Sequence, residues 1–248
     1  VPHEIAAKKT FSVQWSGFLT PTDSGDFLLG ARAAGFIRLT VDDKQVAMAF
    51  RGSATDASVG RIHLEKGRKV AINLAYRLTE GKPHAELIWA RVNNEPSPQA
   101  IAAARNADAV IAVVGITSQL EGEEMPVSEP GFLGGDRTSI DLPEPEERLV
   151  EAVAATGKPL AVVLMNGSAL AVNWINEHAN AVLEAWYPGE EGGAAVAETL
   201  SGKNNPAGRL PVTFYKDVSQ LPNFEDYGMA NRTYRYFNGK PLYPFGYG

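Results

Sequence analysis

The chain has 248 residues, 44% of them hydrophobic and 21% charged, a composition typical of a globular protein with one large or two ordinary domains. Its net charge of −6 would repel a phosphate backbone, and no stripe of Lys and Arg compensates, so nucleic acid is not expected as a partner. No apolar run approaches the roughly 20 residues that cross a membrane, and the absence of cysteine excludes disulfides, thiolate metal ligands and a cysteine nucleophile.

Residues 11–93 contain several short stretches in which apolar and polar side chains alternate, a pattern typical of half-buried antiparallel strands. The alternating apolar positions are Phe11, Val13 and Trp15; Ile37, Leu39 and Val41; Val70, Ile72 and Leu74; and Leu87 and Trp89. Turn-forming residues occur at 23–25, 42–43, 65–67 and 80–83. Short strands at this spacing predict a small β-sandwich or barrel.

A polar, Pro-rich segment, Asn93 to Pro98, marks a linker, and the pattern changes beyond it. Continuous apolar runs indicate buried strands at 109–114, 160–165 and 181–186, and helix signals occur at 98–108, 143–156 and 190–200. Buried strands that alternate with helices predict a mainly parallel sheet covered on both faces. We therefore expect an α/β plus all-β protein, with a β domain at 1–93, a linker at 94–100 and an α/β domain at 101–248.

The connection from Thr117 to Pro143 is long for a compact domain, and structureless connections of this length are mostly functional or disordered. Glu121, Glu123 and Glu124 follow the apolar run 109–114, and ligands of open α/β sheets bind beyond the carboxyl ends of the strands. In an extended segment Glu121 and Glu123 would share one face. A partly desolvated carboxyl group near other carboxylates has a raised pKa, as a general acid requires.

Structural roles remain open for the same residues. Three acidic residues in a loop are common, and a solvated acidic loop is the more frequent outcome. Asp136 and Arg137 follow Gly134-Gly135, which favours a turn. Arg137 can brace a sugar hydroxyl or hold the loop against a catalytic carboxyl group, or the two residues can form an ion pair that fastens the loop.

Other motifs favour structural roles. The run at 189–193, GEEGG, fits the start of the helix that follows, because acidic residues suit the positive end of a helix. Ser168 does not lie in a GxSxG motif, and neither phosphate-binding glycine motif occurs, so no cofactor is expected. The aromatic tail at 232–248 can line a sugar cleft, but packing is the favoured role. The histidines are scattered without ligand spacing, so no metal is expected: His3, His63, His84 and His178.

Four features of the second half are long, ordered segments: the acidic loop that ends in GGDRTSIDLP, ATGKPLAVVLMNGSALAVNW, AVLEAWYPGEEGG, and NPAGRLPVTF followed by YRYF and PLYPFGYG. On these segments, residues from about 105 to 248 closely resemble the C-terminal α/β-sandwich domain of glycoside hydrolase family 3. Residues 11–93 look like a PA14 domain, on the segments FSVQWSGFLTPTDSGDFLLG, RLTVDDKQV and LIWARV. In a subset of the family a PA14 domain is inserted in the sandwich, and the order of the segments here fits that arrangement.

The resemblance implies a retaining exo-acting β-glycosidase, either a β-glucosidase or a β-xylosidase, whose acid/base Glu comes from a loop of the sandwich. The acidic run of related β-xylosidases aligns with Leu120-Glu121-Gly122-Glu123, so Glu123 is the first candidate, Glu121 the second and Glu124 the third. About a dozen residues separate Glu123 from Asp136, which is more than in the shorter family pattern. Asp136 and Arg137 are expected to brace the loop or the substrate.

The resemblance also implies what lies outside this segment. The family's N-terminal barrel carries the nucleophilic Asp, and neither the barrel nor the opening strands of the sandwich occur here, so the chain is expected to be an inactive part of a larger enzyme. A carbohydrate-binding or docking module is the alternative function. A β-linked oligosaccharide is the expected ligand, a homodimer is left open, and the polysaccharide substrate implies a periplasmic or secreted location.

Overall fold

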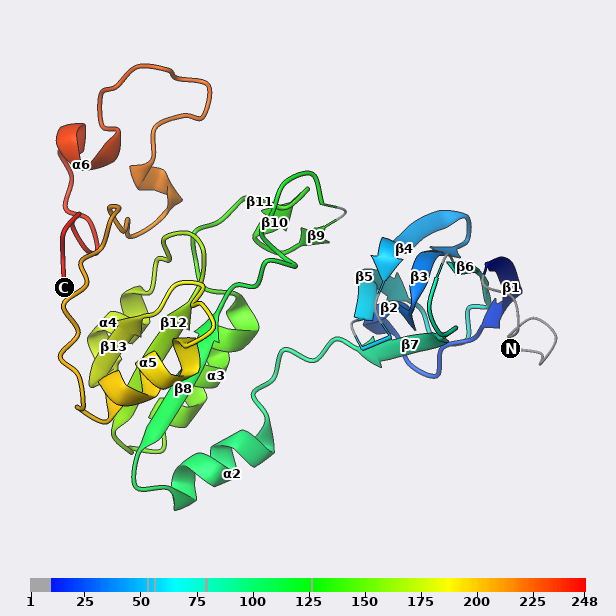
Figure 1. Ribbon diagram of the computed structural model, residues 1–248, viewed down its shortest axis with the longest axis horizontal. Helices are drawn as coiled ribbons and strands as arrows, with labels where there is room; N and C mark the ends of the chain where they lie inside the picture. Colours follow the sequence, from blue (N-terminus) through cyan, green and yellow to red (C-terminus); the bar gives the residue numbers. More distant parts are fainter. Residues whose placement is uncertain (1–9, 53, 56, 79, 126) are drawn as a thin grey trace. The chain divides into compact units, whose positions relative to one another are not determined.

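The computed structural model describes residues 10–248 except 53, 56, 79 and 126, and it consists of two compact units (Figure 1). The first unit comprises Val1–Asn93 and Pro126–Glu129, and the second comprises Asn94–Met125 and Pro130–Gly248. Residues 1–9, with His3, lie outside the described residues. Among the described residues, every helix is too short or too polar to span a bilayer.

The first unit is a sandwich of two antiparallel sheets, in the strand orders β1-β6-β3-β4 and β5-β2-β7. Its strands are β1 (Phe11–Leu19), β2 (Gly25–Ala33), β3 (Gly35–Val41), β4 (Lys44–Gly52), β5 (Ala57–Leu64), β6 (Val70–Leu78) and β7 (Ala85–Arg91). The four stretches of alternating side chains lie in β1, β3, β6 and β7. The two sheets bury one apolar core, which includes Leu29, Ile37, Leu39, Leu74 and Tyr76.

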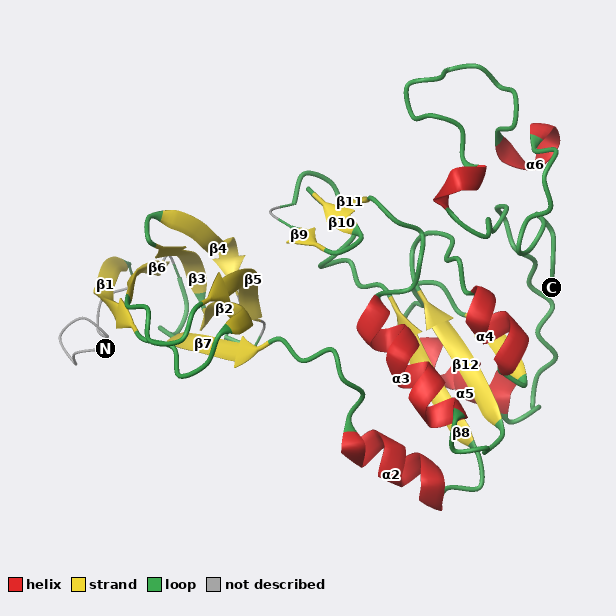
Figure 2. Cartoon of the chain, turned by 180° about the vertical axis from the view of Figure 1, so that it is seen from behind, coloured by secondary structure: helices red, strands yellow, loops and turns green. Residues whose placement is uncertain are grey.

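The second unit contains a parallel sheet in the order β13-β12-β8, formed by β8 (Val110–Gly115), β12 (Leu160–Met165) and β13 (Ala181–Glu184). Figures 1 and 2, seen from opposite sides, show α3 and α5 on opposite faces of this sheet. This two-sided cover accounts for the continuous apolar run of the central strand β12, which is buried along most of its length. On β8, by contrast, Ile111 and Val113 are each 57% exposed. The helices are α2 (Pro98–Asn106), α3 (Glu144–Ala154), α4 (Asn173–His178), α5 (Gly192–Leu200) and α6 (Thr233–Tyr236), with a 3₁₀ turn, η1, at Val218–Gln220.

The boundaries differ in two places from those that the sequence predicts. Helix α2 begins at Pro98, as the helix signal at 98–108 predicts, because the Ser97 hydroxyl oxygen accepts a hydrogen bond from the Ala100 backbone N–H and caps the helix. It ends at Asn106 rather than at 108, and its first residues overlap the linker expected at 94–100. Strand β13 ends at Glu184 rather than at Trp186, because Trp186 adopts a left-handed backbone conformation with φ of +55° that a strand cannot accommodate.

The expectation of a structureless connection after β8 is wrong. The connection contains β9 (Ser128–Glu129), β10 (Phe132–Leu133) and β11 (Asp136–Arg137), which form a small sheet in the order β11-β10-β9 with β10 and β11 antiparallel. Gly134 and Gly135 join β10 to β11 with φ of +66° and +92°. This two-residue turn with positive φ at both positions is favoured in hairpins, and glycine adopts it without strain.

Candidate active site at the carboxyl edge of the parallel sheet

Each of the three parallel strands leads into a polar residue at the same edge of the sheet. Strand β8 leads to Glu121, β12 is followed directly by Asn166, and β13 ends with Glu184. The carboxyl edge of a parallel sheet is where open α/β folds bind ligands. The second unit therefore gathers its candidate chemistry at this edge.

The acidic run after β8 is a series of turns rather than an extended segment. The backbone N–H groups of Leu120 and Glu121 both donate to the Thr117 carbonyl oxygen, at 3.0 and 3.2 Å. The expectation that Glu121 and Glu123 share a face is therefore wrong, because it assumed the alternation of a strand. Glu121 is half-buried, whereas Glu123 and Glu124 are exposed, and Glu124 has a φ of +50°.

Two glycines of the β10–β11 turn hold the acidic run in place. The Gly122 N–H donates to the Gly135 carbonyl oxygen at 3.1 Å, and the Met125 N–H donates to the Gly134 carbonyl oxygen at 2.8 Å. A Cβ atom on Gly135 would lie 1.9 Å from the Gly122 carbonyl oxygen, so only glycine permits this approach. The Gly-Gly turn thus brings the acidic run next to the strand that carries Arg137.

Arg137 fastens the loop to the end of β12. Its guanidinium donates to the Ser139, Ala169 and Asp141 carbonyl oxygens and to Ser168 Oγ at 2.9 to 3.2 Å. Burial lowers the pKa of Arg137, and the negative charge of Glu121 partly offsets this effect. The acceptors of Arg137 are these four oxygens, whereas Asp136 is exposed, so the described contacts do not include the ion pair between Asp136 and Arg137 that the sequence left open.

Glu121 lies in the electrostatic field of Arg137 and of Tyr187, which follows β13. Its Oε2 atom is buried and has no hydrogen-bond partner in the described part of the chain. Burial raises the pKa of the Tyr187 hydroxyl, and the charge of Glu121 raises it further. The Tyr187 ring packs on Gly167, where a Cβ would meet ring atom Cε2 at 2.7 Å.

Buried Asn166 and half-buried Glu184 form a polar pair that sequence reasoning missed. Asn166 Nδ2 donates to Glu184 Oε2 at 3.3 Å and to the Ser168 carbonyl oxygen at 2.8 Å, and the Trp186 N–H donates to Glu184 Oε1 at 3.0 Å. Burial raises the pKa of Glu184 to about 7, although these hydrogen bonds oppose the shift. The missed signal is a polar residue at the carboxyl end of an apolar strand.

Two other motifs of the sequence are the run at 189–193, which begins a helix, and the aromatic tail, whose side chains are partly packed and partly exposed. Helix α5 begins at Gly192 with Glu191 at its N-cap, so the predicted helix start at 189–193 is confirmed. Within the tail, Tyr243 packs against the buried ring of Phe214 and donates from its hydroxyl to Asn176 Oδ1 at 2.7 Å. Other tail aromatics, such as Tyr234 and Tyr247, are more than half exposed.

Comparison with known proteins identifies the family. The model of the glycosyl hydrolase family 3 C-terminal domain matches residues 6–248. A xylan 1,4-β-xylosidase of Xylanibacter ruminicola is 40% identical over 96% of this chain and 28% of its own length. A periplasmic β-glucosidase of Salmonella typhimurium is 41% identical over 60% of this chain and 21% of its own length.

Solved structures agree with this assignment. The structure of DesR, a β-glucosidase of Streptomyces venezuelae, matches with a TM-score of 0.64 and 25% identity over 94% of this chain and 30% of that one. The chain thus spans less than a third of the length of these relatives. Because the family model covers nearly all of the sequence, the chain belongs to the glycosyl hydrolase family 3 C-terminal domain family.

Proposed function

We propose that the chain is the acid/base-bearing part of a retaining, exo-acting β-glycosidase, a β-glucosidase or a β-xylosidase that removes terminal non-reducing sugars. The observation that carries the proposal is the family match over residues 6–248, together with an acidic loop at the carboxyl edge of the sheet. Relatives named as β-xylosidases and β-glucosidases support the substrate class. An N-terminal barrel of the same longer protein would supply the nucleophilic Asp.

Within the acidic run we assign the acid/base role to Glu123. Glu121 is half-buried beside Arg137 and Tyr187, an environment that suits a carboxylate holding the loop. Glu123 is exposed, so its carboxyl group is free to meet a substrate bound by another domain. Glu124 is exposed as well but has a left-handed backbone conformation, so we keep it as the third candidate after Glu121.

The chemistry follows from two carboxyl groups about 5–5.5 Å apart, as retaining glycosidases require. The barrel Asp attacks the anomeric carbon and forms a glycosyl ester, while protonated Glu123 donates its proton to the departing glycosidic oxygen. Ionised Glu123 then takes a proton from water, which attacks the anomeric carbon and releases the sugar and the Asp carboxylate.

The test compares Glu121→Gln, Glu123→Gln and Glu124→Gln in the complete enzyme. For aryl glycosides with poor leaving groups, Glu123→Gln should lower kcat/KM by about 10²–10⁴-fold. With a dinitrophenyl leaving group, which departs without a proton, kcat/KM should be retained, and azide should restore kcat by replacing water as the nucleophile. An undiminished rate of Glu123→Gln on an unactivated disaccharide would assign the role elsewhere.

The incomplete active site gives a second test. The purified 248-residue polypeptide, with its mass confirmed, should hydrolyse neither an aryl β-glucoside nor an aryl β-xyloside, because the nucleophile is proposed to lie on the barrel. Robust hydrolysis would overturn this division of catalytic roles. The complete enzyme is proposed to act in the periplasm or outside the cell, which fractionation of the source cells would test.

One observation favours carbohydrate binding by the first unit as a second candidate function. Strands β1, β6 and β7 line an apolar pocket of about 370 Å³ with Trp15, Phe18 and Leu87 at its surface, and aromatic faces are suited to stacking on sugar rings. We propose that the unit is PA14-like and binds oligosaccharides there. Calorimetric titration with xylo- and cello-oligosaccharides tests this, and a lack of heat would count against it.

A further inference from the structure

A loop of the second unit, residues 223–232, is held together by one arginine. Arg232 Nε donates to the Gly228 carbonyl oxygen at 3.0 Å. Its Nη2 atom donates to the carbonyl oxygens of Asn223, at 3.1 Å, and of Asp226. Arg232 is half-buried, whereas the other residues of the loop are exposed. Because a guanidinium carries its donors in a fixed planar array, these bonds fix the path of the backbone around it.

Two side chains near the start of the loop stabilise turns. Asn223 Oδ1 accepts from the Glu225 N–H at 3.0 Å, and Asp226 Oδ1 accepts from the Gly228 N–H at 2.8 Å. Asn and Asp favour such turns, because their short side chains reach the backbone two residues on. The loop is therefore ordered by its own residues, and a ligand that binds it does not have to order it first.

The base of the loop is closed. An antiparallel bridge between Phe214 and Tyr243 joins the segments that lead into and out of the loop, with N–H to carbonyl oxygen bonds of 2.9 and 3.1 Å. Closer to the loop, Gln220 Oε1 accepts from the Lys216 N–H at 2.8 Å, and Gln220 Nε2 donates to the Lys240 carbonyl oxygen at 3.2 Å. Compact surface loops with closed ends are frequently functional.

Two aromatic side chains of this ordered loop are almost fully in solvent. Phe224 is 92% exposed and Tyr227 91%, and among the described residues no other large apolar side chain exceeds the 73% of Phe50. Met229, two residues beyond Tyr227, is 52% exposed. Large apolar side chains that are grouped on the surface, rather than scattered, mark interaction sites.

The residues between the two rings indicate the chemistry of the ligand. Glu225 and Asp226 separate Phe224 from Tyr227 in the sequence. Acidic residues are depleted from the cores of protein–protein interfaces, because a carboxylate buried without a partner is costly. A sugar suits the combination, since the apolar face of its ring stacks on an aromatic ring and its hydroxyl groups donate to carboxylates. The loop therefore favours an uncharged sugar over an apolar protein surface.

The loop lies beyond the carboxyl edge of the parallel sheet, at the same end as β10 and β11 (Figures 1 and 2). An acid/base residue at this edge protonates the departing glycosidic oxygen, so the sugars on the leaving-group side of the scissile bond lie on its side of the substrate. We propose that Phe224 and Tyr227 form a stacking subsite for these leaving-group sugars. The inference rests on the proposed function and adds a specificity-determining site to it.

The first experiment measures sugar binding to the 248-residue chain and does not depend on activity. Backbone amide shifts of residues 223–232 are followed by NMR during titration with xylotetraose and, separately, with cellotetraose. We expect saturable shifts with at least one of these sugars, and a Kd about 3-fold to 10-fold higher in Phe224→Ala and in Tyr227→Ala. Because the shifts are read within the loop, binding at the pocket of the first unit does not contribute to them.

Phe50→Ala, which removes an exposed ring from β4, is the matched control and should leave the Kd at the loop unchanged. A loop whose amides do not shift with either sugar would overturn the proposal. A Kd that both loop variants leave unchanged would overturn it as well.

The second experiment measures selectivity in the complete enzyme. A glycosyl fluoride has no leaving-group sugar, whereas the tetrasaccharide of the same sugar has several. Phe224→Ala and Tyr227→Ala should each lower kcat/KM for the tetrasaccharide by about 3-fold to 10-fold and leave kcat/KM for the fluoride unchanged. An equal loss on both substrates, or no loss on either, would refute the subsite.

Thermal unfolding of the same variants distinguishes a ligand site from a contact with another domain. A lower Tm of the complete enzyme, with unchanged selectivity, would assign the two rings to such a contact and overturn the proposal. If the wild type hydrolyses neither substrate, the proposed function fails, and the titration alone decides whether the loop binds sugar.

Discussion

Asn166 donates from Nδ2 to Glu184 Oε2 at 3.3 Å and so joins the carboxyl ends of β12 and β13. Asn166 is fully buried, and its own Oδ1 has no hydrogen-bond partner among the described residues. The donation from Asn166 lowers the pKa of Glu184 and so favours the ionised carboxylate, whereas burial raises the pKa and is the larger effect. Burial, and not this hydrogen bond, therefore favours the neutral carboxyl group.

The stability of the second unit should fall as the pH rises, because burial raises the pKa of Glu184 from its ordinary value of 4.5 to about 7 in the folded chain. The folded state retains the proton that the unfolded state has lost between these values, so stability is full below about pH 4.5 and declines up to about pH 7. Glu184→Gln should remove about 2 kcal/mol of the difference in unfolding free energy between pH 5 and pH 8.

Urea unfolding of the wild type and the variant at both pH values measures this difference. Glu177→Gln, at an exposed position of α4, is the control and should leave the pH dependence as it is in the wild type. A pH dependence of Glu184→Gln equal to that of the wild type would show that this carboxyl group does not titrate between the two values.

Arg137→Ala should destabilise the second unit by about 2–4 kcal/mol, because four oxygen acceptors, three of them on half-buried residues, lose a charged donor. Arg137→Lys should recover only part of this loss, since an ammonium group cannot reproduce the planar array of donors. Chemical denaturation gives both values. A loss below about 0.5 kcal/mol for the alanine variant, as is usual at the surface, would mean that the guanidinium does not fasten the loop.

Gly135→Ala should displace the acidic loop, whereas Gly134→Ala should be tolerated. A Cβ at 135 would lie 1.9 Å from the Gly122 carbonyl oxygen, but a Cβ at 134 meets nothing within 4 Å. Both positions have positive φ, so the alanine at 134 should cost only about 1–2 kcal/mol of backbone strain. In the complete enzyme the 135 variant should lose about 10²-fold in kcat/KM. Equal kinetic effects of the two variants would argue that backbone strain, and not the close approach, governs the loop.

Local patterns of residues predicted many of the helices and strands. The alternating side chains of residues 11–15 and 70–74 predicted strands of the β-sandwich, and the apolar run 160–165 predicted β12. Helix signals placed α3 to within two residues at each end. Such patterns are local, because the period of burial along a segment depends on its own backbone geometry. The family segments between residues 105 and 248 likewise predicted the α/β architecture.

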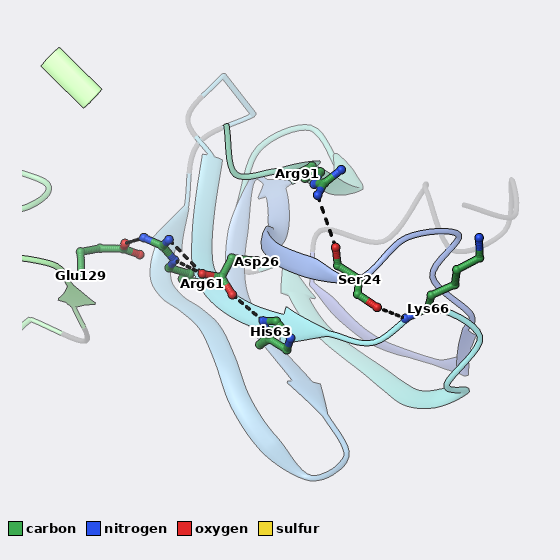
Figure 3. A network of polar contacts seen from close by, with 7 residues as sticks. All are labelled: Ser24, Asp26, Arg61, His63, Lys66, Arg91 and Glu129. Atoms are coloured by element: carbon green, nitrogen blue, oxygen red, sulfur yellow. Dashed lines mark hydrogen bonds and ion pairs between the residues drawn. The ribbon is translucent and has the colours of Figure 1, made fainter. Parts of the chain in front are cut away.

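Which side chains contact one another depends on the tertiary fold and not on local patterns. In the second unit, Arg137 and Ser168 lie 31 positions apart in the sequence, and Asn166 and Glu184 lie 18 positions apart. In the first unit, Asp26 and Arg61 lie 35 positions apart (Figure 3). No local period links such pairs, since their distance depends on the order of strands in the sheets and on the path of the loop. The same holds for the acidic run, where turns and the close approach of Gly135 to Gly122 leave Glu123 exposed and Glu121 half-buried. The sequence thus located the acidic loop, and packing determined the environment of each of its carboxyl groups.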